Sequence, residues 1–195
     1  MSLEVEEARI VIRAGPRRIF GIPTYLNMLG SVKMAPARYL AGVARAEGRP
    51  LYAEDPRLRR ALEAICSECA AAEAGEGRAV SRAEVVEAYY NALAPQLLSL
   101  APSIDSIVVP CYTGALGEAV ARRAEESAPG VALIAVKLGE GGCSWADAVY
   151  TAQAVDERLK SLNLGPASLA AISAALKAAE ELNLYSTLVV LTDGR

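Results

Sequence analysis

The segment YLNMLGSVKMAPARYL, residues 25–40, places Lys33 directly after a turn of small residues and before an apolar, helix-like run. A cation at the first turn of a helix faces the positive end of the helix dipole, where it is unfavourable. If this turn lies at the ligand-binding edge of a sheet, burial lowers the pKa of the amine. A neutral lysine can then form an imine with an aldehyde. The alternative is a solvent-exposed lysine at the start of a surface helix.

A second segment, PCYTGALG, places the small residues Thr113, Gly114, Ala115 and Gly117 between an apolar run and a helix-like run. Backbone N–H groups at the start of a helix bind anions, and small side chains let a phosphate approach them. The pattern therefore predicts a phosphate site. A tight turn that packs the helix against the sheet would use the same residues, so this alternative stays open.

The sequence contains no histidine, so any proton chemistry must use Lys, Tyr, Cys or a carboxylate. Its four cysteines are Cys66, Cys69, Cys111 and Cys143, and only the first two form a CxxC. A zinc site would have to gather all four thiolates from distant segments, and a redox pair is a further alternative. We favour the interpretation that the cysteines act as small hydrophobic residues, with Cys69 on a helix stripe, and we expect no metal.

Composition and charge exclude several classes of protein. The net charge is −3 and no basic stripe dominates, so we expect no nucleic-acid partner. No apolar run reaches the roughly 18 residues that cross a bilayer, so we expect no membrane partner. The acidic start MSLEVEEARI lacks the apolar region of a signal peptide, which predicts a cytoplasmic protein. Abundant Arg, Glu and Ala with few Asn and Gln are typical of thermophilic proteins.

The first half is predicted to contain two strands followed by helices. The strands, 9–13 and 18–26, flank a Gly15-Pro16 turn, and Pro23 makes the second an edge strand or a short one. Gly48 predicts the end of a first helix, and Asp55 followed by Pro56 predicts the start of a second. Ser81 and Glu84 form a capping box at the start of a third helix, which Pro95 kinks or splits.

The second half alternates apolar strands with helices. Strands are predicted at 104–110, 131–138 and 186–192, and helices at 113–130, 144–162 and 166–182. Continuous apolar strands of this kind belong to parallel sheets covered on both faces. We therefore predict an α/β fold with three layers and a mostly parallel sheet, in a single domain over 1–195, with 49–100 as a helical inserted segment.

The lysine segment resembles that of the fold-type II pyridoxal-phosphate enzymes, which include cysteine synthase and threonine synthase. The residues that match their pattern without a gap are Leu26, Asn27, Gly30, Ser31, Val32 and Lys33. Segments 104–140 and 164–195 are similar to the second half and the end of the same enzymes. The resemblance implies the large-domain fold of this family, pyridoxal phosphate as cofactor, and elimination or replacement at the β- or γ-carbon of an amino acid.

The resemblance also implies roles for individual residues. Lys33 falls on the Schiff-base lysine, and Asn27 and Ser31 belong to the same cofactor-binding segment. The residues that fall on or near the phosphate-binding loop are Thr113, Gly114, Ala115 and Gly117. Thr192 or Ser168 would meet the pyridine nitrogen.

The chain departs from the family in ways that favour other hypotheses. Met34 and Ala35 replace Asp-Arg, Asp193 replaces a glycine, and the substrate-binding Ser-Gly-Asn-Thr-Gly loop is absent. The helical segment 49–100 stands where the family has a small domain, which is largely deleted. The chain could therefore be a catalytically silent scaffold or partner-binding protein, or a small α/β domain that binds a phosphate ligand.

Loss of a small domain would expose apolar surface, which predicts a homo-oligomer, most simply a two-fold dimer. The residues available for such an interface are Tyr89, Tyr90, Leu93, Leu97 and Leu98. The alternative is that these side chains fill the core of one chain.

Overall fold

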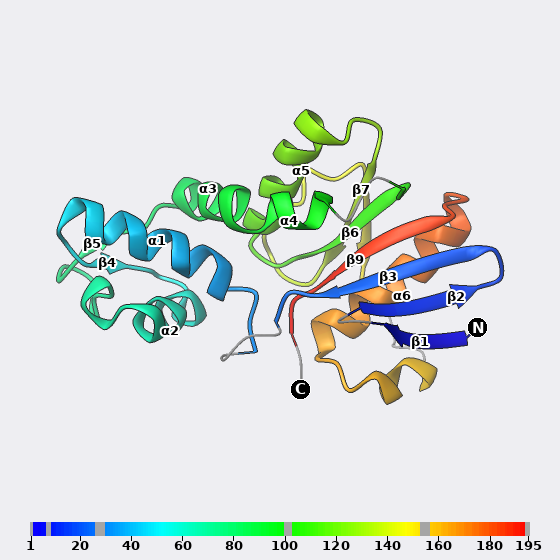
Figure 1. Ribbon diagram of the computed structural model, residues 1–195, viewed down its shortest axis with the longest axis horizontal. Coiled ribbons are helices and arrows are strands. Elements are labelled where there is room, and N and C mark those ends of the chain that lie inside the picture. The colour runs from blue at the N-terminus through cyan, green and yellow to red at the C-terminus, as the bar shows by residue number, and fades with distance from the viewer. Residues whose placement is uncertain (1, 7–8, 26–29, 100–102, 153–156, 194–195) are drawn as a thin grey trace.

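The computed structural model describes residues 2–6, 9–25, 30–99, 103–152 and 157–193, and the side chains at 2–6, 9, 157 and 158 are not described. The chain consists of a sheet flanked by helices and a helical lobe beyond one end of the sheet (Figure 1). We use the name helical lobe for residues 34–92. Its last helix leads back to the sheet.

The sheet has seven strands in the order β1-β2-β3-β9-β6-β7-β8. The strands are β1 (Ser2–Glu6), β2 (Arg9–Ala14), β3 (Arg17–Pro23), β6 (Ser106–Cys111), β7 (Ala132–Lys137), β8 (Ala148–Thr151) and β9 (Ser186–Leu191). β1, β2 and β3 pair antiparallel, whereas every pairing from β3 to β8 is parallel. The predicted mostly parallel sheet is confirmed.

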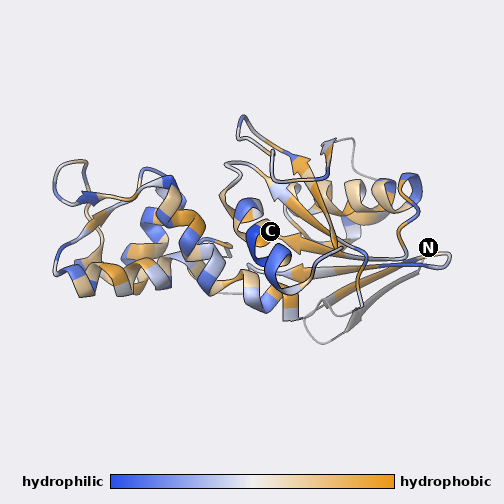
Figure 2. Cartoon of the chain, turned by 90° about the horizontal axis from the view of Figure 1, so that it is seen from above, coloured by the Kyte–Doolittle hydropathy of each residue, from blue (hydrophilic) through white to orange (hydrophobic). Residues whose placement is uncertain are grey.

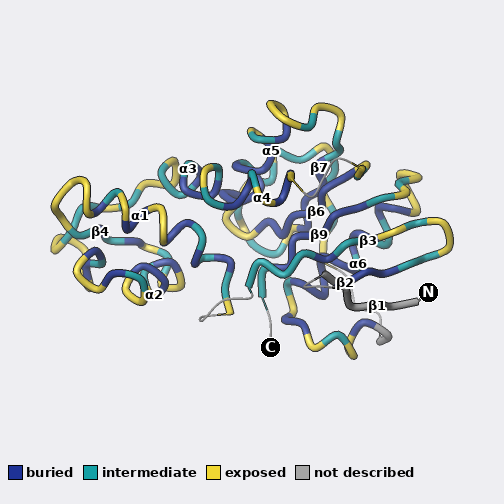
Figure 3. Tube along the Cα trace, in the orientation of Figure 1, coloured by how far each residue is buried: buried dark blue, intermediate teal, exposed yellow. Residues whose placement is uncertain are grey.

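Helices cover both faces of this sheet. α3 (Arg82–Ala92), α4 (Ala94–Ser99) and α5 (Ala115–Ser127) pack on one face, and α6 (Pro166–Glu181) packs on the other. Figure 2 shows the hydrophobic strands between these helices, and Figure 3 shows β6 and β9 as buried strands. Burial on both faces explains why these strands are continuously apolar, and the three-layer α/β prediction is confirmed.

The helical lobe has a hydrophobic core of its own. It contains α1 (Met34–Glu47), α2 (Pro56–Ile65), the short helix η1 (Ser67–Cys69), the two-residue strands β4 (Leu51–Tyr52) and β5 (Arg78–Ala79), and α3. Leucines from α1, α2 and β4 form the centre, and small alanines let the helices approach closely. α3 packs against both α1 and α5, so it connects the lobe to the sheet.

The helix signals of the first half are confirmed. Gly48 ends α1 with a left-handed backbone (φ 66°). Asp55 accepts hydrogen bonds from the first turn of α2, and Pro56 is its first residue. Ser81 and Glu84 form the capping box of α3. The helix is interrupted between Ala92, where α3 ends, and Ala94, where α4 begins, just before Pro95.

Two predictions about elements are wrong. The helix expected over 144–162 is absent from its described part, where β8 is followed by the short helix η2 (Glu157–Leu162). β8 pairs with the free edge of β7, and this pairing overrides the local helical pattern. Of the two alternatives for Pro23, the edge strand is wrong, because β3 lies between β2 and β9. β3 does end at Pro23, before the predicted limit at 26.

The preferred interpretation of the cysteines is also wrong. Cys66 forms a disulfide with Cys69, and Cys111 forms one with Cys143. Both pairs have Cα–Cα distances in the range that a disulfide needs, 5.2 and 6.2 Å. The second pair joins the end of β6 to the loop after β7, and spacing alone cannot reveal such a contact. The four thiolates therefore do not gather into a zinc site.

Candidate functional site

The predicted site residues follow the carboxyl ends of three adjacent parallel strands. β3 leads to Ser31 and Lys33, β9 leads to Thr192, and β6 leads to the turn 113–117. Ligands of open α/β sheets bind at this edge. Asn27 lies outside the described residues.

Lys33 lies immediately before α1, and its side chain enters the helical lobe. The Lys33 backbone N–H donates to the Ser31 hydroxyl oxygen (3.2 Å). Lys33 Nζ lies 2.7 Å from Asp55 Oδ2, and only 15% of the side chain is exposed. The ammonium also lies 5.9 Å from the centre of the Tyr89 ring. The lysine is therefore held between the start of α2 and the middle of α3.

This environment keeps the lysine charged. Burial by itself lowers the pKa of Lys33, but the interactions with Tyr89 and Asp55 outweigh it, so the pKa is raised. Burial likewise raises the pKa of Asp55, and the bonds from Lys33 and from the first turn of α2 reverse this, so that pKa is lowered. The expected lowering of the Lys33 pKa is wrong. The reason is two side chains from distant segments, Tyr89 on α3 and Asp55, which lies 22 positions further along the chain and caps a different helix.

The turn 113–117 does start a helix, as predicted, but other parts of the chain cover it. Gly114 has a left-handed backbone (φ 80°) and begins α5. A Cβ on Gly114 would collide with the carbonyl oxygen of Gly142, and one on Gly117 would collide with the Trp145 indole. The small residues therefore admit the chain's own loop 139–145, as the tight-turn alternative expected.

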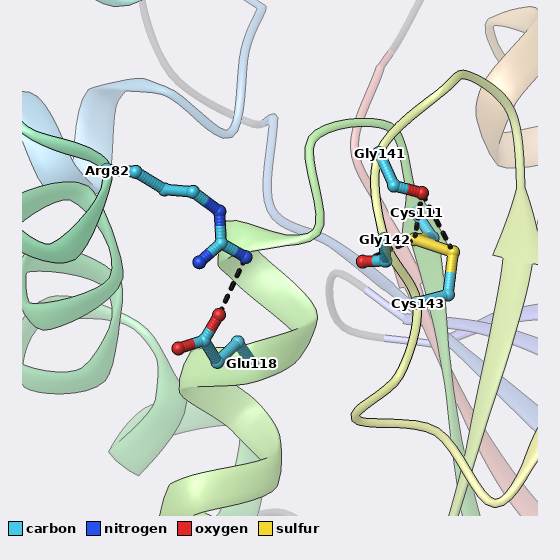
Figure 4. Close-up of a disulfide and its surroundings, with 6 residues drawn as sticks. All are labelled: Arg82, Cys111, Glu118, Gly141, Gly142 and Cys143. Atoms are coloured by element: carbon cyan, nitrogen blue, oxygen red, sulfur yellow. Dashed lines mark hydrogen bonds and ion pairs between the residues drawn. A yellow bond between two sulfur atoms is a disulfide. The ribbon is translucent and has the colours of Figure 1, made fainter.

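The Cys111–Cys143 disulfide holds this loop at the turn (Figure 4). The Gly141 N–H donates to the Tyr112 carbonyl (3.0 Å), which adds a backbone contact at the same place. Figure 4 also shows Arg82 reaching from α3 to Glu118 on α5, at 2.6 Å. The sequence reasoning missed Arg82, because nothing local indicates that the start of α3 lies beside α5.

Ser31, Ser168 and Thr192 lie around Asp193. Ser31 and Asp193 form an antiparallel bridge, and Thr192 is the half-buried residue before Asp193. Ser168 is fully buried at the start of α6. Its backbone N–H and its hydroxyl both donate to Asp193 Oδ1 (2.8 and 2.6 Å).

Asp193 therefore caps α6. The Ala167 N–H donates to its other carboxylate oxygen (3.2 Å), and a negative charge is favourable at the start of a helix. Burial and the charge of Asp193 raise the pKa of Tyr25. The residue that the sequence marked as a departure from the family thus organises this part of the site, and Ser168 is its partner.

Comparisons with known proteins support the fold through structure alone. No protein-family model and no curated protein matches the chain. Solved structures do match, and three are described as an O-acetylserine-dependent cystathionine β-synthase from Helicobacter pylori, an O-ureido-L-serine synthase and a hydrogen sulfide-producing enzyme from Fusobacterium nucleatum.

These similarities extend over most of each chain. The TM-scores are 0.77, 0.75 and 0.76, with 17%, 15% and 16% sequence identity. The matches cover 92%, 96% and 95% of this chain and 87%, 88% and 94% of the others, in the same order. The chain therefore has the α/β fold of the fold-type II pyridoxal-phosphate enzymes.

The site as it is arranged does not fit pyridoxal phosphate. The Lys33 amine is charged and bonded to Asp55. The turn that would hold the phosphate is covered by loop 139–145 and by Trp145. The Ser168 hydroxyl is bonded to a carboxylate. No helix among the described residues is long and apolar enough to cross a membrane.

Proposed function

We propose that this chain is a catalytically silent protein with the fold of the fold-type II enzymes, and that it acts by binding a partner or ligand. The observation that carries this proposal is the 2.7 Å ion pair between Lys33 and Asp55. An imine-forming lysine must present a neutral amine, whereas this pair and Tyr89 favour the ammonium.

In this proposal Lys33 has a structural role. Its ammonium joins the start of α1 to the start of α2 through Asp55, and to α3 through Tyr89. Because α3 also packs on α5, these contacts fix the helical lobe against the sheet. We propose further that the helical segment 49–100 replaces the small domain of the family within a single α/β domain.

The second candidate is a reduced pyridoxal-phosphate enzyme that performs β- or γ-elimination or replacement on an amino acid. It is favoured by the position of Lys33 at the carboxyl edge, with Ser31, Ser168 and Thr192 gathered nearby. It requires Lys33 to leave Asp55 and loop 139–145 to leave the turn 113–117.

One labelling experiment separates the two candidates. Purified protein is titrated with pyridoxal phosphate, its visible spectrum is recorded, and the mixture is reduced with borohydride and mapped by peptide mass spectrometry. Lys33→Ala is compared with Lys177→Ala, which changes a half-buried lysine on α6. We expect scattered labelling of surface lysines, unchanged by Lys33→Ala. Labelling concentrated on Lys33 and lost only in Lys33→Ala would overturn the silent function and establish the second candidate.

The homo-oligomer stays a prediction. Tyr89, Leu93, Leu97 and Leu98 are buried inside one chain, and the Tyr90 hydroxyl donates to Glu126 of the same chain (2.6 Å). These residues fill the core, so a dimer would have to use another surface. Light scattering at micromolar concentration measures the mass of the particle in solution. A monomeric mass would mean that the chain binds a different protein or a ligand rather than a second copy of itself.

A further inference from the structure

We propose that a cavity next to the lysine segment binds a small carboxylate with an apolar body. The cavity has a volume of about 410 Å³ and lies between the end of β3, the first turns of α1 and the junction of α3 with α4. The residues that line it are Ile22, Pro23, Thr24, Met34, Ala35, Arg38, Ala92, Leu93, Gln96 and Leu97. This volume is in the range of small-molecule sites.

Most of the described side chains on the wall are apolar, and they share its surface with polar atoms. β3 contributes Ile22, α1 contributes Met34, and the α3–α4 junction contributes Leu93 and Leu97. The Thr24 hydroxyl donates to the Leu191 carbonyl (2.7 Å), which ties this part of the wall to β9. A hydrocarbon or aromatic body would gain free energy here by leaving water, at about 25 cal/mol per Å² of apolar surface buried.

The charge of the lining favours an anion. Among the described residues that line the cavity, Arg38 is the one charged side chain and none is acidic. Within the part of the chain that the structure describes, Arg38 forms no ion pair. Guanidinium groups bind carboxylates through two parallel hydrogen bonds, which gives this ligand class an advantage over a neutral molecule.

Two further features of the cavity favour an anionic ligand. The first turn of α1 contains no acidic residue and supplies Met34 and Ala35 to the wall, so the positive end of the α1 dipole lies beside the cavity. Gln96 donates one amide hydrogen to the Ala92 carbonyl (3.1 Å) and keeps a second donor for a ligand oxygen. This proposal does not depend on whether Lys33 binds a cofactor, because the Lys33 ammonium points into the helical lobe toward Asp55.

The experiment measures binding of 4-phenylbutyrate and of its neutral amide, 4-phenylbutyramide, by calorimetry. It also follows the methyl carbon signals of ¹³C-labelled methionine, with Met34 assigned through Met34→Leu. We expect the acid to bind and to shift the Met34 signal. The amide should bind at least about tenfold more weakly, since hydrogen bonds to charged groups contribute about 1.5–3 kcal/mol.

Variants test which residues recognise the ligand. Arg38→Gln should weaken binding of the acid by about tenfold or more, whereas Arg45→Gln, an exposed arginine in the last turn of the same helix, should leave it unchanged. Ala92→Phe, which fills the cavity, should abolish binding, with circular dichroism to check folding. Equal affinity for acid and amide, no effect of Arg38→Gln, or no binding of the acid at millimolar concentration would each overturn the proposal.

Discussion

The strands of the sheet and the helices of the lobe fill their cores with different side chains. β6 and β9 bury Ile107, Val109, Leu188 and Val190 almost completely, whereas the helices of the lobe meet through small alanines around a few leucines. Alanine buries little apolar area, so each lobe residue gains less from the hydrophobic effect. The lobe depends more on polar links, whereas the sheet depends more on its own apolar strands.

The polar links of the lobe join its elements at several points. Lys33 is bonded to Asp55, and Arg78 bridges Glu47 of α1 and Glu84 of α3, at 2.7 Å each. Each region also has a disulfide, but the pair in the lobe closes a short segment and the pair at the sheet closes a long one. The comparison therefore predicts different responses to changes in the two regions.

Removing the disulfides should give the largest difference. In the chain-entropy description, a crosslink stabilises more when it closes a longer loop. Cys111 and Cys143 are 32 positions apart, against 3 for Cys66 and Cys69. By denaturant unfolding, we expect the double alanine variant at Cys111 and Cys143 to lose about 4 kcal/mol of unfolding free energy, and the one at Cys66 and Cys69 to lose about 2 kcal/mol. Equal losses would contradict the assignment of loop length as the cause.

Breaking the Lys33–Asp55 pair should have the next largest effect. Lys33→Met leaves a partly buried carboxylate without its cation, and we expect it to cost about 3 kcal/mol. Asp55→Asn is the matched change, because asparagine still caps α2 but carries no charge. A double-mutant cycle should give a coupling of about 2 kcal/mol, and a coupling near zero would show that the pair does not fix the lobe.

A pair of glycine substitutions tests packing in the two regions. Gly117→Ala should displace Trp145, the one tryptophan of the chain, because the added Cβ would occupy the position of the indole. We expect a red shift of the tryptophan fluorescence and a loss of about 2 kcal/mol. Gly42→Ala on α1 meets no atom within 4 Å and should stabilise by up to about 1 kcal/mol without a fluorescence change. An unshifted spectrum in Gly117→Ala would mean that Trp145 does not cover the turn.

Acid should weaken the lobe through Glu84, with the smallest effect. The hydrogen bond that Arg78 donates lowers the pKa of Glu84 from 4.5 to about 2. Burial opposes this shift, and the hydrogen bonds from Ser81 reinforce it. A lowered folded-state pKa stabilises the fold above the unfolded pKa, and this contribution is lost as the pH falls from about 4.5 through about 2. Because Glu84 is largely solvated, we expect only about 1 kcal/mol. Comparison of wild type with Glu84→Gln at pH 6 and pH 2.5 checks this, and Glu63→Gln, an exposed change on α2, is the control.

Local signals predicted the fold well where a few neighbouring residues decide the structure. Continuous apolar runs identified β6, β7 and β9, and Gly48, Asp55 and Ser81 located helix ends, because a cap depends on its own turn of backbone. β8 was missed, since its structure depends on the free edge of β7. β1 was not expected from the sequence.

The sequence by itself determined that β6, β7 and β9 are buried, that α5 follows β6 and α6 precedes β9, and to which carboxyl edge Lys33, Thr113 and Thr192 belong. Only the tertiary structure decided what these residues contact. Asp55 forms an ion pair with Lys33, loop 139–145 covers the turn at Gly114, and Asp193 accepts a hydrogen bond from the Ser168 hydroxyl. Each of these contacts joins residues 22 or more positions apart. A pKa or a covered helix end depends on every charge and atom within a few ångströms, and sequence spacing does not reveal which distant segment supplies them.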